Sequence, residues 1–301
     1  MTTPRELQAL YQQGVNITQL LRAEQTPPRS AREIIEIAYD LQAGSYTAAM
    51  HNAPMAQHKR DYAAEIASTI LSLCTPMSVL EAGVGEATTL AGVLPHLEPK
   101  VRSYGFDLSW SRVAYARSWL QHQGLAGTTL CTGDLLHIPF ADNSIDVVYT
   151  SHSIEPNGGS EEPMLRELFR VSKKFLLLLE PGYELASAEA QQRMEAHGYC
   201  RNLPGIARAL GYDVQRHSLF PLSVNPLNPT AMTIIRKGDD GAAAAHVLAC
   251  PQFKTPLQEI DHMLFSAEAL RAYPIVGGIP CLRLENGILA SKYEEVMRAG
   301  Q

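Results

Sequence analysis

The sequence predicts an α/β protein built on a doubly wound, Rossmann-like and mostly parallel sheet, with an N-terminal helical lid and a small α+β C-terminal domain. Three observations lead to this fold class. Short apolar segments alternate with helical segments from Ser78 to Arg236, and the first of them runs straight into the turn Gly83-Val-Gly85. Acidic residues stand at the ends of the first three expected strands. Such alternation is typical of parallel sheets that bind ligands at the carboxyl ends of their strands.

The chain before the first strand predicts two or three helices. Apolar residues recur at helical spacing over 4–24, and a Ser-x-x-Glu capping box opens a second helix over 30–41. A third helix is expected over 59–74. We expect these helices, within residues 1–75, to form a lid over the site, with plain packing against the sheet as the alternative.

The core is expected to occupy residues 76–238. Its last two strands, joined by a Pro- and Asn-rich stretch, are expected to form an antiparallel edge pair. The expected strands cover 79–82, 102–108, 128–132, 145–151, 174–180, 212–219 and 230–236. The expected helices cover 87–94, 110–123, 161–171, 186–197 and 203–210.

A glycine-bounded run of small residues, 238–245, predicts a linker. Beyond it the sequence consists of short β-like pieces, with little helix until 291–298. We therefore expect a domain boundary near residue 240 and a separate small domain over 239–301.

The overall composition is ordinary for a folded soluble protein. The chain has 301 residues, 46% of them hydrophobic, and a formal charge of −6, which argues against a general polyanion-binding surface. Five scattered cysteines indicate a reducing compartment. The N-terminus lacks the layout of a signal peptide, and the longest apolar run is too short to span a bilayer. These features predict a cytoplasmic protein that does not enter a membrane.

The spacing of the acidic residues points to a nucleoside ligand. Asp107 follows Gly85 by 22 residues, close to the ~20 expected for an acid that binds ribose hydroxyls. Asp134 follows the third strand and suits an adenine amine. Either acid alone is more often a helix cap or turn residue. Glu86 in the turn would repel a pyrophosphate, and Asp146 is interpreted as structural.

This pattern resembles the class I S-adenosylmethionine-dependent methyltransferases over Ser78 to Lys237. The resemblance lies in Val79-Leu-Glu-Ala-Gly-Val-Gly-Glu-Ala, in Phe106-Asp-Leu-Ser, and in Gly133-Asp-Leu-Leu and the run that follows it. It implies that the methionine end of the cofactor lies near Glu81 and Gly83, the ribose at Asp107, and the adenine at Asp134 and the Leu135 N–H. The cofactor-binding residues implied are Tyr39, Tyr46, Glu81, Gly83, Gly85, Asp107, Leu108, Asp134, Leu135 and Ser151.

The methyl acceptor is expected beside the segment after the fourth strand, where His152 and Glu155 are the candidate catalytic residues. His152 has the intrinsic pKa of a general base, and Glu155 would act as a base or bind an acceptor amine. The alternatives are that His152 packs against the cofactor and that Glu155 caps the next segment. Ser153-Ile-Glu-Pro stands where the amide- and adenine-methylating branch carries Asn-Pro-Pro-Tyr, which disfavours that branch.

The tail resembles the small methyltransferase-activator proteins, many of which bind zinc. Leu248-Ala-Cys-Pro and Tyr273-Pro-Ile-Val-Gly-Gly-Ile-Pro carry this resemblance. Only Cys250 and Cys281 remain of the cysteines such a site needs, so we expect no bound metal. The resemblance suggests that the tail stabilises the core or closes over substrate in the same chain, with a folding appendage as the alternative.

The leading hypothesis is a methyltransferase that moves a methyl group from S-adenosylmethionine to an O or N atom of a small molecule or short peptide. A non-catalytic cofactor-binding scaffold, an RNA or protein methyltransferase and a nicotinamide dehydrogenase are the alternatives. Nucleic acid is disfavoured as a partner by the acidic charge. The sequence is compatible with a homo-oligomer and does not decide the oligomeric state.

Overall fold

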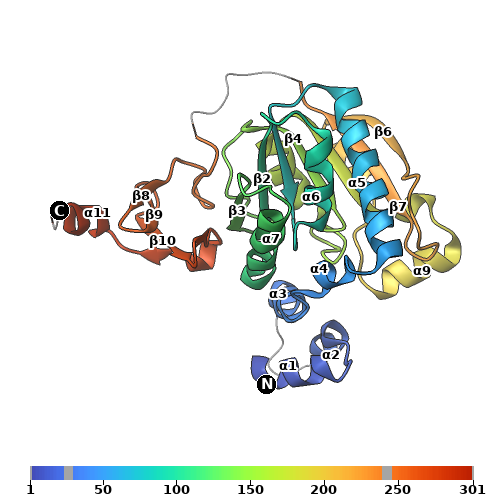
Figure 1. The fold of residues 1–301 in the computed structure, drawn as a ribbon, viewed down its shortest axis with the longest axis horizontal. Helices are drawn as coiled ribbons and strands as arrows, with labels where there is room; N and C mark the ends of the chain where they lie inside the picture. The colour runs from blue at the N-terminus through green and yellow to red at the C-terminus, as the bar shows by residue number, and fades with distance from the viewer. Residues whose placement is uncertain (1, 24–29, 239–245, 300–301) are drawn as a thin grey trace.

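The computed structural model describes residues 2–23, 30–238 and 246–299. Its centre is a seven-stranded sheet in the order β3-β2-β1-β4-β5-β7-β6 (Figure 1). Strands β1 to β5 run parallel, and β7 runs antiparallel to both of its neighbours, β5 and β6. The predicted fold class is therefore confirmed. The last two strands pair as expected, but β7 lies inside the sheet, so that of these two only β6 is an edge strand.

The boundaries of the core follow the expected pattern closely. The strands are β1 (Ser78–Ala82), β2 (Arg102–Asp107), β3 (Thr129–Thr132), β4 (Ile145–Ser151), β5 (Ser172–Pro181), β6 (Asp213–Leu219) and β7 (Thr230–Arg236). The helices between them are α6 (Thr88–Val93), α7 (Trp110–His122), α8 (Glu161–Val171), α9 (Ala188–Ala196) and α10 (Leu203–Ala209), with short 3-10 turns at Leu94–His96 and Tyr183–Leu185.

Helices cover both faces of the sheet (Figure 1). On one face α5 (Ala53–Leu73), α6 and α7 pack through a buried cluster that includes Ile66, Leu90 and Val113. On the other face α8 and α10 pack through a second cluster that includes Leu165 and Ala207. Strand β1 is buried along its whole length because it lies at the centre of the sheet. Burial on both faces explains why the parallel strands are nearly continuous apolar runs.

Asp146 has the structural role expected from its position at the start of β4. Its Oδ2 accepts hydrogen bonds from the Met77 N–H at 2.8 Å and from Lys174 Nζ at 3.1 Å. The carboxylate thereby ties the amino ends of β1, β4 and β5 together, at the edge of the sheet opposite the ligand-binding ends.

The N-terminal region differs from the expected pattern in two places. The single helix expected over 4–24 is two helices, α1 (Pro4–Gln12) and α2 (Ile17–Ala23), because the chain turns at Gly14 with a φ of 85°. The third helix, α5, begins at Ala53 rather than at Lys59, because Asn52 caps it.

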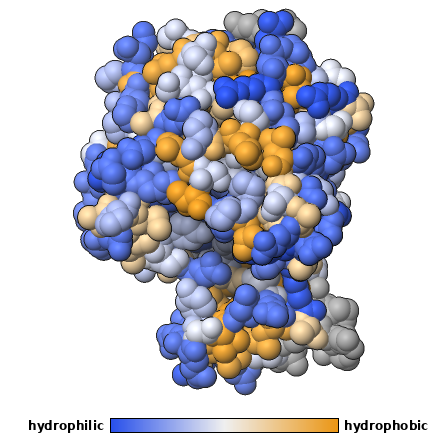
Figure 2. All heavy atoms as spheres, turned by 90° about the vertical axis from the view of Figure 1, so that its right-hand side faces the viewer, coloured by the Kyte–Doolittle hydropathy of each residue, from blue (hydrophilic) through white to orange (hydrophobic). Residues whose placement is uncertain are grey.

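Two further helices lie between α2 and α5. Helix α3 (Ala31–Leu41) is capped by Ser30 as expected, and the short α4 (Ser45–Ala49) was not expected. The helices α1, α2 and α3 share a small apolar cluster of their own. Figure 2 shows that α1 and α2 form a narrower part at the bottom of the molecule, set off from the larger body.

The C-terminal segment, residues 246–299, forms a second, antiparallel sheet. Its strands are β8 (Gln258–Ile260), β9 (Met263–Ser266), β10 (Arg271–Val276), β11 (Ile279–Pro280) and β12 (Ile288–Leu289). A 3-10 turn at Leu284–Asn286 lies between β11 and β12, and α11 (Tyr293–Ala299) follows β12. The expected linker lies outside the described residues except for Gly238.

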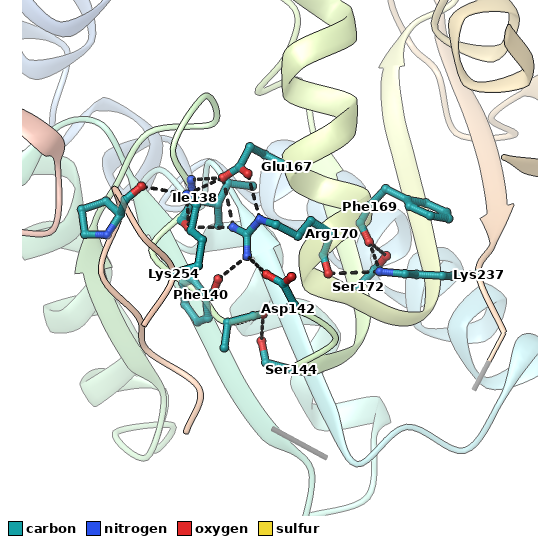
Figure 3. Close-up of polar contacts among 12 residues, drawn as sticks. Ile138, Phe140, Asp142, Ser144, Glu167, Phe169, Arg170, Ser172, Lys237 and Lys254 are labelled. Atoms are coloured by element: carbon teal, nitrogen blue, oxygen red, sulfur yellow. Dashed lines mark hydrogen bonds and ion pairs between the residues drawn. The ribbon is translucent and has the colours of Figure 1, made fainter. Parts of the chain in front are cut away.

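This segment docks against the edge strand β3. The Leu282 N–H donates to the Thr132 carbonyl at 3.1 Å, and the Ala249 N–H donates to the Pro139 carbonyl at 3.0 Å. Figure 3 shows a second attachment, in which Lys254 Nζ lies 2.8 Å from the Glu167 carboxylate on α8. Side chains of both parts belong to one apolar cluster. An edge strand that would otherwise expose its hydrogen-bonding groups is therefore covered.

Candidate functional site

A cavity of about 610 Å³ lies at the carboxyl ends of β1 to β4, and residues of α3 and α4 form part of its wall. Its size is in the range of small-molecule sites, ~300–1,000 Å³. Another cavity, of about 500 Å³, lies at the amino ends of β2 and β3, where none of the predicted site residues stands. The first cavity is lined by all twelve predicted site residues: Tyr39, Tyr46, Glu81, Gly83, Gly85, Asp107, Leu108, Asp134, Leu135, Ser151, His152 and Glu155.

The glycine turn after β1 needs glycine for steric reasons. Gly83 and Gly85 have φ angles of 75° and 53°, and a Cβ on Gly83 would lie 2.2 Å from the Cβ of Ser153. Ala87, where a third glycine is common in the family of the resemblance, also has a left-handed φ of 56°. Alanine at this position carries a conformational cost, because an L-residue in this region costs ~1–2 kcal/mol.

Asp107 is fixed by the backbone around it. Its Oδ2 accepts the Gly85 N–H at 2.9 Å and its Oδ1 accepts the Ser109 N–H at 3.0 Å. Each carboxylate oxygen has a second lone pair, so both can still accept a hydroxyl hydrogen from a ligand. The side chain is thus both a turn-stabilising residue and a preorganised acceptor in the cavity wall.

Asp134 is held on one side and faces a cation on the other. Its Oδ1 accepts the Leu136 N–H at 2.9 Å, and its Oδ2 lies 2.6 Å from Nη2 of Arg32 on α3. The same guanidinium lies 2.9 Å from Glu285 of the C-terminal segment. Arg32 thus occupies the position that an adenine amine would take. Sequence reasoning missed this residue, since no local pattern links α3 to the end of β3.

Glu86 lines the cavity, but its carboxylate is also engaged by the protein itself. Its carboxylate accepts the backbone N–H groups of Gly44, Tyr46 and Thr47 at 2.7–3.3 Å. These groups belong to the start of α4, where unpaired donors favour a negative charge. Asp40 makes a similar link, since it accepts from the Ser109 hydroxyl at 2.6 Å. Two carboxylates therefore fasten the helices at the cavity to the core.

Comparison with known proteins now decides the family of this part of the chain. Residues 79–174 match the family described as "Methyltransferase domain". Residues 79–174 are therefore identified as a methyltransferase domain. This agrees with the resemblance of the core to the class I S-adenosylmethionine-dependent methyltransferases. The activator-like resemblance of 239–301 stays a prediction.

Solved structures with the same fold include the magnesium protoporphyrin IX methyltransferase of Synechocystis PCC 6803. With bound SAH it has a TM-score of 0.54 at 13% identity, over 68% of this chain and 99% of that chain. With bound SAM it has a TM-score of 0.52 at 14% identity, over 69% and 98%. A candidate O-methyltransferase from Nostoc punctiforme PCC 73102 has a TM-score of 0.52 at 14% identity, over 66% and 60%. At these identities the likeness concerns the fold alone.

Glu81 of the methyltransferase domain is a buried carboxyl at the base of the cavity. It is 2% exposed, and Tyr149 donates its hydroxyl hydrogen to Oε2 at 3.2 Å. Burial raises the pKa of Glu81 to about 8, although the charge of Lys59 and the Tyr149 hydrogen bond act in the opposite direction. Near neutral pH the carboxyl group is therefore protonated in a large share of molecules. A cation that binds beside it would lower its pKa and favour loss of that proton.

His152 and Glu155 form a pair in the cavity wall. Nδ1 of His152 hydrogen-bonds the Glu155 carboxylate, and Nε2 lies 2.8 Å from the Thr230 hydroxyl. Burial lowers the pKa of His152, but the hydrogen bond and charge of Glu155 outweigh it and raise the pKa above its usual value. Burial likewise raises the pKa of Glu155, and the contact with His152 more than reverses this. Both ring nitrogens are therefore engaged.

A further buried carboxyl holds the loop that carries this pair. Glu180, at the end of β5, accepts the N–H groups of Ser153, Ile154 and Glu155 at 3.0–3.1 Å. Burial raises the pKa of Glu180 to about 7. The three hydrogen bonds explain why the loop can hold His152 at a φ of 57°, a conformation that few non-glycine residues adopt.

Besides Arg32, three cations that sequence reasoning did not single out line the cavity. They are Arg22 of α2, Lys59 of α5 and Arg112 of α7. Arg112 lies over the rings of Tyr39 and Tyr46, with Cζ 5.2 and 4.7 Å from their centres. An arginine in the first turn after the ribose acid was the available signal for Arg112.

Within the described ranges no helix has the length and apolarity needed to cross a bilayer.

Proposed function

We propose that this chain transfers a methyl group from S-adenosylmethionine to an oxygen or nitrogen atom of a small molecule or a short peptide. The observation that carries the proposal is the gathering of all twelve predicted site residues around one cavity. A cavity of about 610 Å³, walled by α3 and α4, favours an acceptor of limited size. The net charge of −6 supplies no attraction for RNA.

The residues present fit an adenosyl cofactor. Asp107 offers lone pairs to ribose hydroxyls, and Asp134 Oδ2, now paired with Arg32, would accept an adenine amine in place of that guanidinium. Gly83 and Gly85 both line the cavity, so the backbone of the turn is part of the wall that the cofactor would contact. Glu81 would bind the ammonium group at the methionine end. When bound, the cofactor supplies the electrophilic methyl group.

Methyl transfer asks the protein to align the acceptor and, where needed, to take its proton. His152 could take a proton only as the neutral ring with Nε2 released from the Thr230 hydroxyl. The ionised Glu155 accepts hydrogen bonds only, and the Asn228 amide lies 3.3 Å from its Oε1. We therefore assign His152 as the base and Glu155 as the group that sets its tautomer and charge.

We further propose that the chain has three parts: a lid over 1–75, a core over 76–238 and an activator-like module over 239–301. The module would act on the core and the lid of the same chain. Arg283 hydrogen-bonds Glu36 of α3 at 2.6 Å and the Leu108 carbonyl at 3.2 Å. Leu108 follows the ribose acid directly. The segment thereby contacts the lid and the cofactor side of the core at once, which suits a stabilising role.

Calorimetry of the ligand-free protein with S-adenosylmethionine and SAH tests the cofactor. We expect Asp107→Ala and Asp134→Ala to weaken binding at least tenfold, since each removes hydrogen bonds to the ligand. Asp213→Asn, an exposed carboxylate paired with Arg236, is the matched control and should bind normally. Absence of binding to the wild-type protein would refute the proposal.

A non-catalytic scaffold is the second candidate, and the engagement of both His152 ring nitrogens favours it. The two functions differ in their products. Incubation with labelled S-adenosylmethionine and fractionated cell extract should yield a labelled small product with wild type and not with His152→Asn. If cofactor binds but no fraction becomes labelled, the scaffold is favoured.

A further inference from the structure

Arg32 on α3 is shared between two carboxylates that belong to different parts of the chain. Its Nη2 lies 2.6 Å from Oδ2 of Asp134, in the cavity wall, and 2.9 Å from Oε2 of Glu285, in the C-terminal segment. Nη2 donates hydrogen bonds to both carboxylate oxygens of Glu285, at 3.1 and 2.9 Å, whereas Asp134 Oδ2 has no hydrogen-bond donor among the described residues. The guanidinium is therefore oriented toward Glu285 and attracts Asp134 by its charge alone.

Asp134 lacks a hydrogen-bond donor at the oxygen that Arg32 covers. Its side chain is 7% exposed, and its other oxygen, Oδ1, already accepts the Leu136 N–H at 2.9 Å. A buried carboxylate oxygen without a donor costs free energy, which a ligand N–H group would recover. A ligand amine at Oδ2 would therefore improve the hydrogen bonding of Asp134. It would also displace the guanidinium, which then needs another anion because an unpaired charge is costly at a partly buried site.

Glu285 is held beside Arg32 by a second ion pair between the same two segments. Arg283 hydrogen-bonds the Glu285 carboxylate, and its Nη2 donates to Glu36 of α3 at 2.6 Å. Arg32 and Glu36 are four residues apart on α3, so they lie on one face of the helix. The two pairs, Arg32 with Glu285 and Glu36 with Arg283, therefore match opposite charges on α3 and on the C-terminal segment, and they keep Glu285 within reach of the guanidinium.

We infer that Glu285 is a positioning residue for cofactor binding, which retains Arg32 when the adenine amine takes the place of the guanidinium at Asp134. This inference rests on the proposed function. With Glu285 present, Arg32 gives up one anion and keeps the other, so no charge is left unpaired. With an uncharged residue at 285, Asp134 is the carboxylate that remains to Arg32, and the guanidinium competes for it more strongly. The described part of the C-terminal segment does not line the cavity, yet through Arg32 it raises the affinity of the cavity for cofactor.

A double-mutant cycle tests this inference on the full-length protein, with SAH as the probe and calorimetry as the measurement. The variants are Glu285→Gln, Arg32→Gln and the combination of the two. We expect Glu285→Gln alone to weaken SAH binding about five- to tenfold, the range for coupling between charged neighbours. In the Arg32→Gln background the same substitution should change the affinity less than about twofold, because no guanidinium is left to compete for Asp134. Glu295→Gln, an exposed carboxylate paired with Lys292 on α11, is the matched control and should bind as wild type does.

Two outcomes would overturn the inference alone. Unchanged or tighter SAH binding by Glu285→Gln would show that Glu285 does not retain the guanidinium. Equal weakening in both backgrounds would show that Glu285 acts by docking the C-terminal segment and not through Arg32. If Glu285→Gln does not fold, judged by its thermal transition, Glu285→Asp replaces it in the cycle, since its carboxylate is one methylene further from Arg32. Failure of the wild-type protein to bind SAH would instead refute the proposed cofactor itself.

Discussion

Replacing Glu86 with alanine should release the start of α4 from the glycine turn. The carboxylate accepts four hydrogen bonds, from the N–H groups of Gly44, Tyr46 and Thr47 and from the Thr47 hydroxyl. Hydrogen bonds to a charged group contribute ~1.5–3 kcal/mol each, but these four share one carboxylate and water can reach part of α4 after its loss. We expect the free energy of opening α4 to be about 3 kcal/mol lower in Glu86→Ala than in wild type, which raises the population of the open form about 100-fold.

Hydrogen exchange measures this opening directly. The amides of 44, 46 and 47 should exchange about 100-fold faster in Glu86→Ala, while amides in the middle of α5 should be unchanged. Glu86→Gln keeps the shape and one acceptor oxygen, so it should show a smaller acceleration. Equal exchange at 44–47 in wild type and Glu86→Ala would refute the view that this carboxylate fastens α4.

Three other changes test further contacts at the cavity. A double-mutant cycle of His152→Asn and Glu155→Gln should give a coupling of about 1 kcal/mol near pH 6. Because the folded pKa of His152 is raised, this coupling is fully present below ~6.5 and is lost as the pH rises through the folded pKa, which urea unfolding at several pH values would detect. Arg32→Gln should tighten SAH binding up to about tenfold by calorimetry, since the guanidinium competes for Asp134. Arg283→Gln should lower the melting temperature by a few degrees, since it breaks the link to α3.

The core could be predicted from the sequence because its signals are local. Each strand is a short apolar run, each helix begins or ends at a cap or glycine, and the acids follow strands directly. The parallel order then places Glu81, Asp107 and Asp134 at one edge without further information. All twelve predicted residues line one cavity for this reason.

The contacts that decide the chemistry were beyond the sequence because they join distant segments. Glu86 reaches Gly44 across 42 residues, and Arg32 reaches Asp134 from α3, which precedes the whole sheet in the sequence. The hydrogen bond that occupies Nε2 of His152 comes from Thr230, 78 residues away. Short-range patterns report which residue types are present and not which partner occupies each lone pair. Charges in the turn were therefore assigned to the ligand when the protein itself uses them.

The Glu86 carboxylate is engaged by α4, so we expect Glu81 to contribute most to a preference for an adenosyl sulfonium over a pyrophosphate. Its pKa of about 8 means that a cationic ammonium which binds beside it will drive out a proton, whereas an anion would keep the proton in place. We therefore expect proton release when SAH binds, and an affinity that rises with pH up to about 8. Calorimetry near pH 6.5 in two buffers of different ionisation enthalpy measures the release, and Glu81→Gln should abolish it. Proton uptake, or a release that persists in Glu81→Gln, would contradict the assignment of this carboxyl to the ammonium.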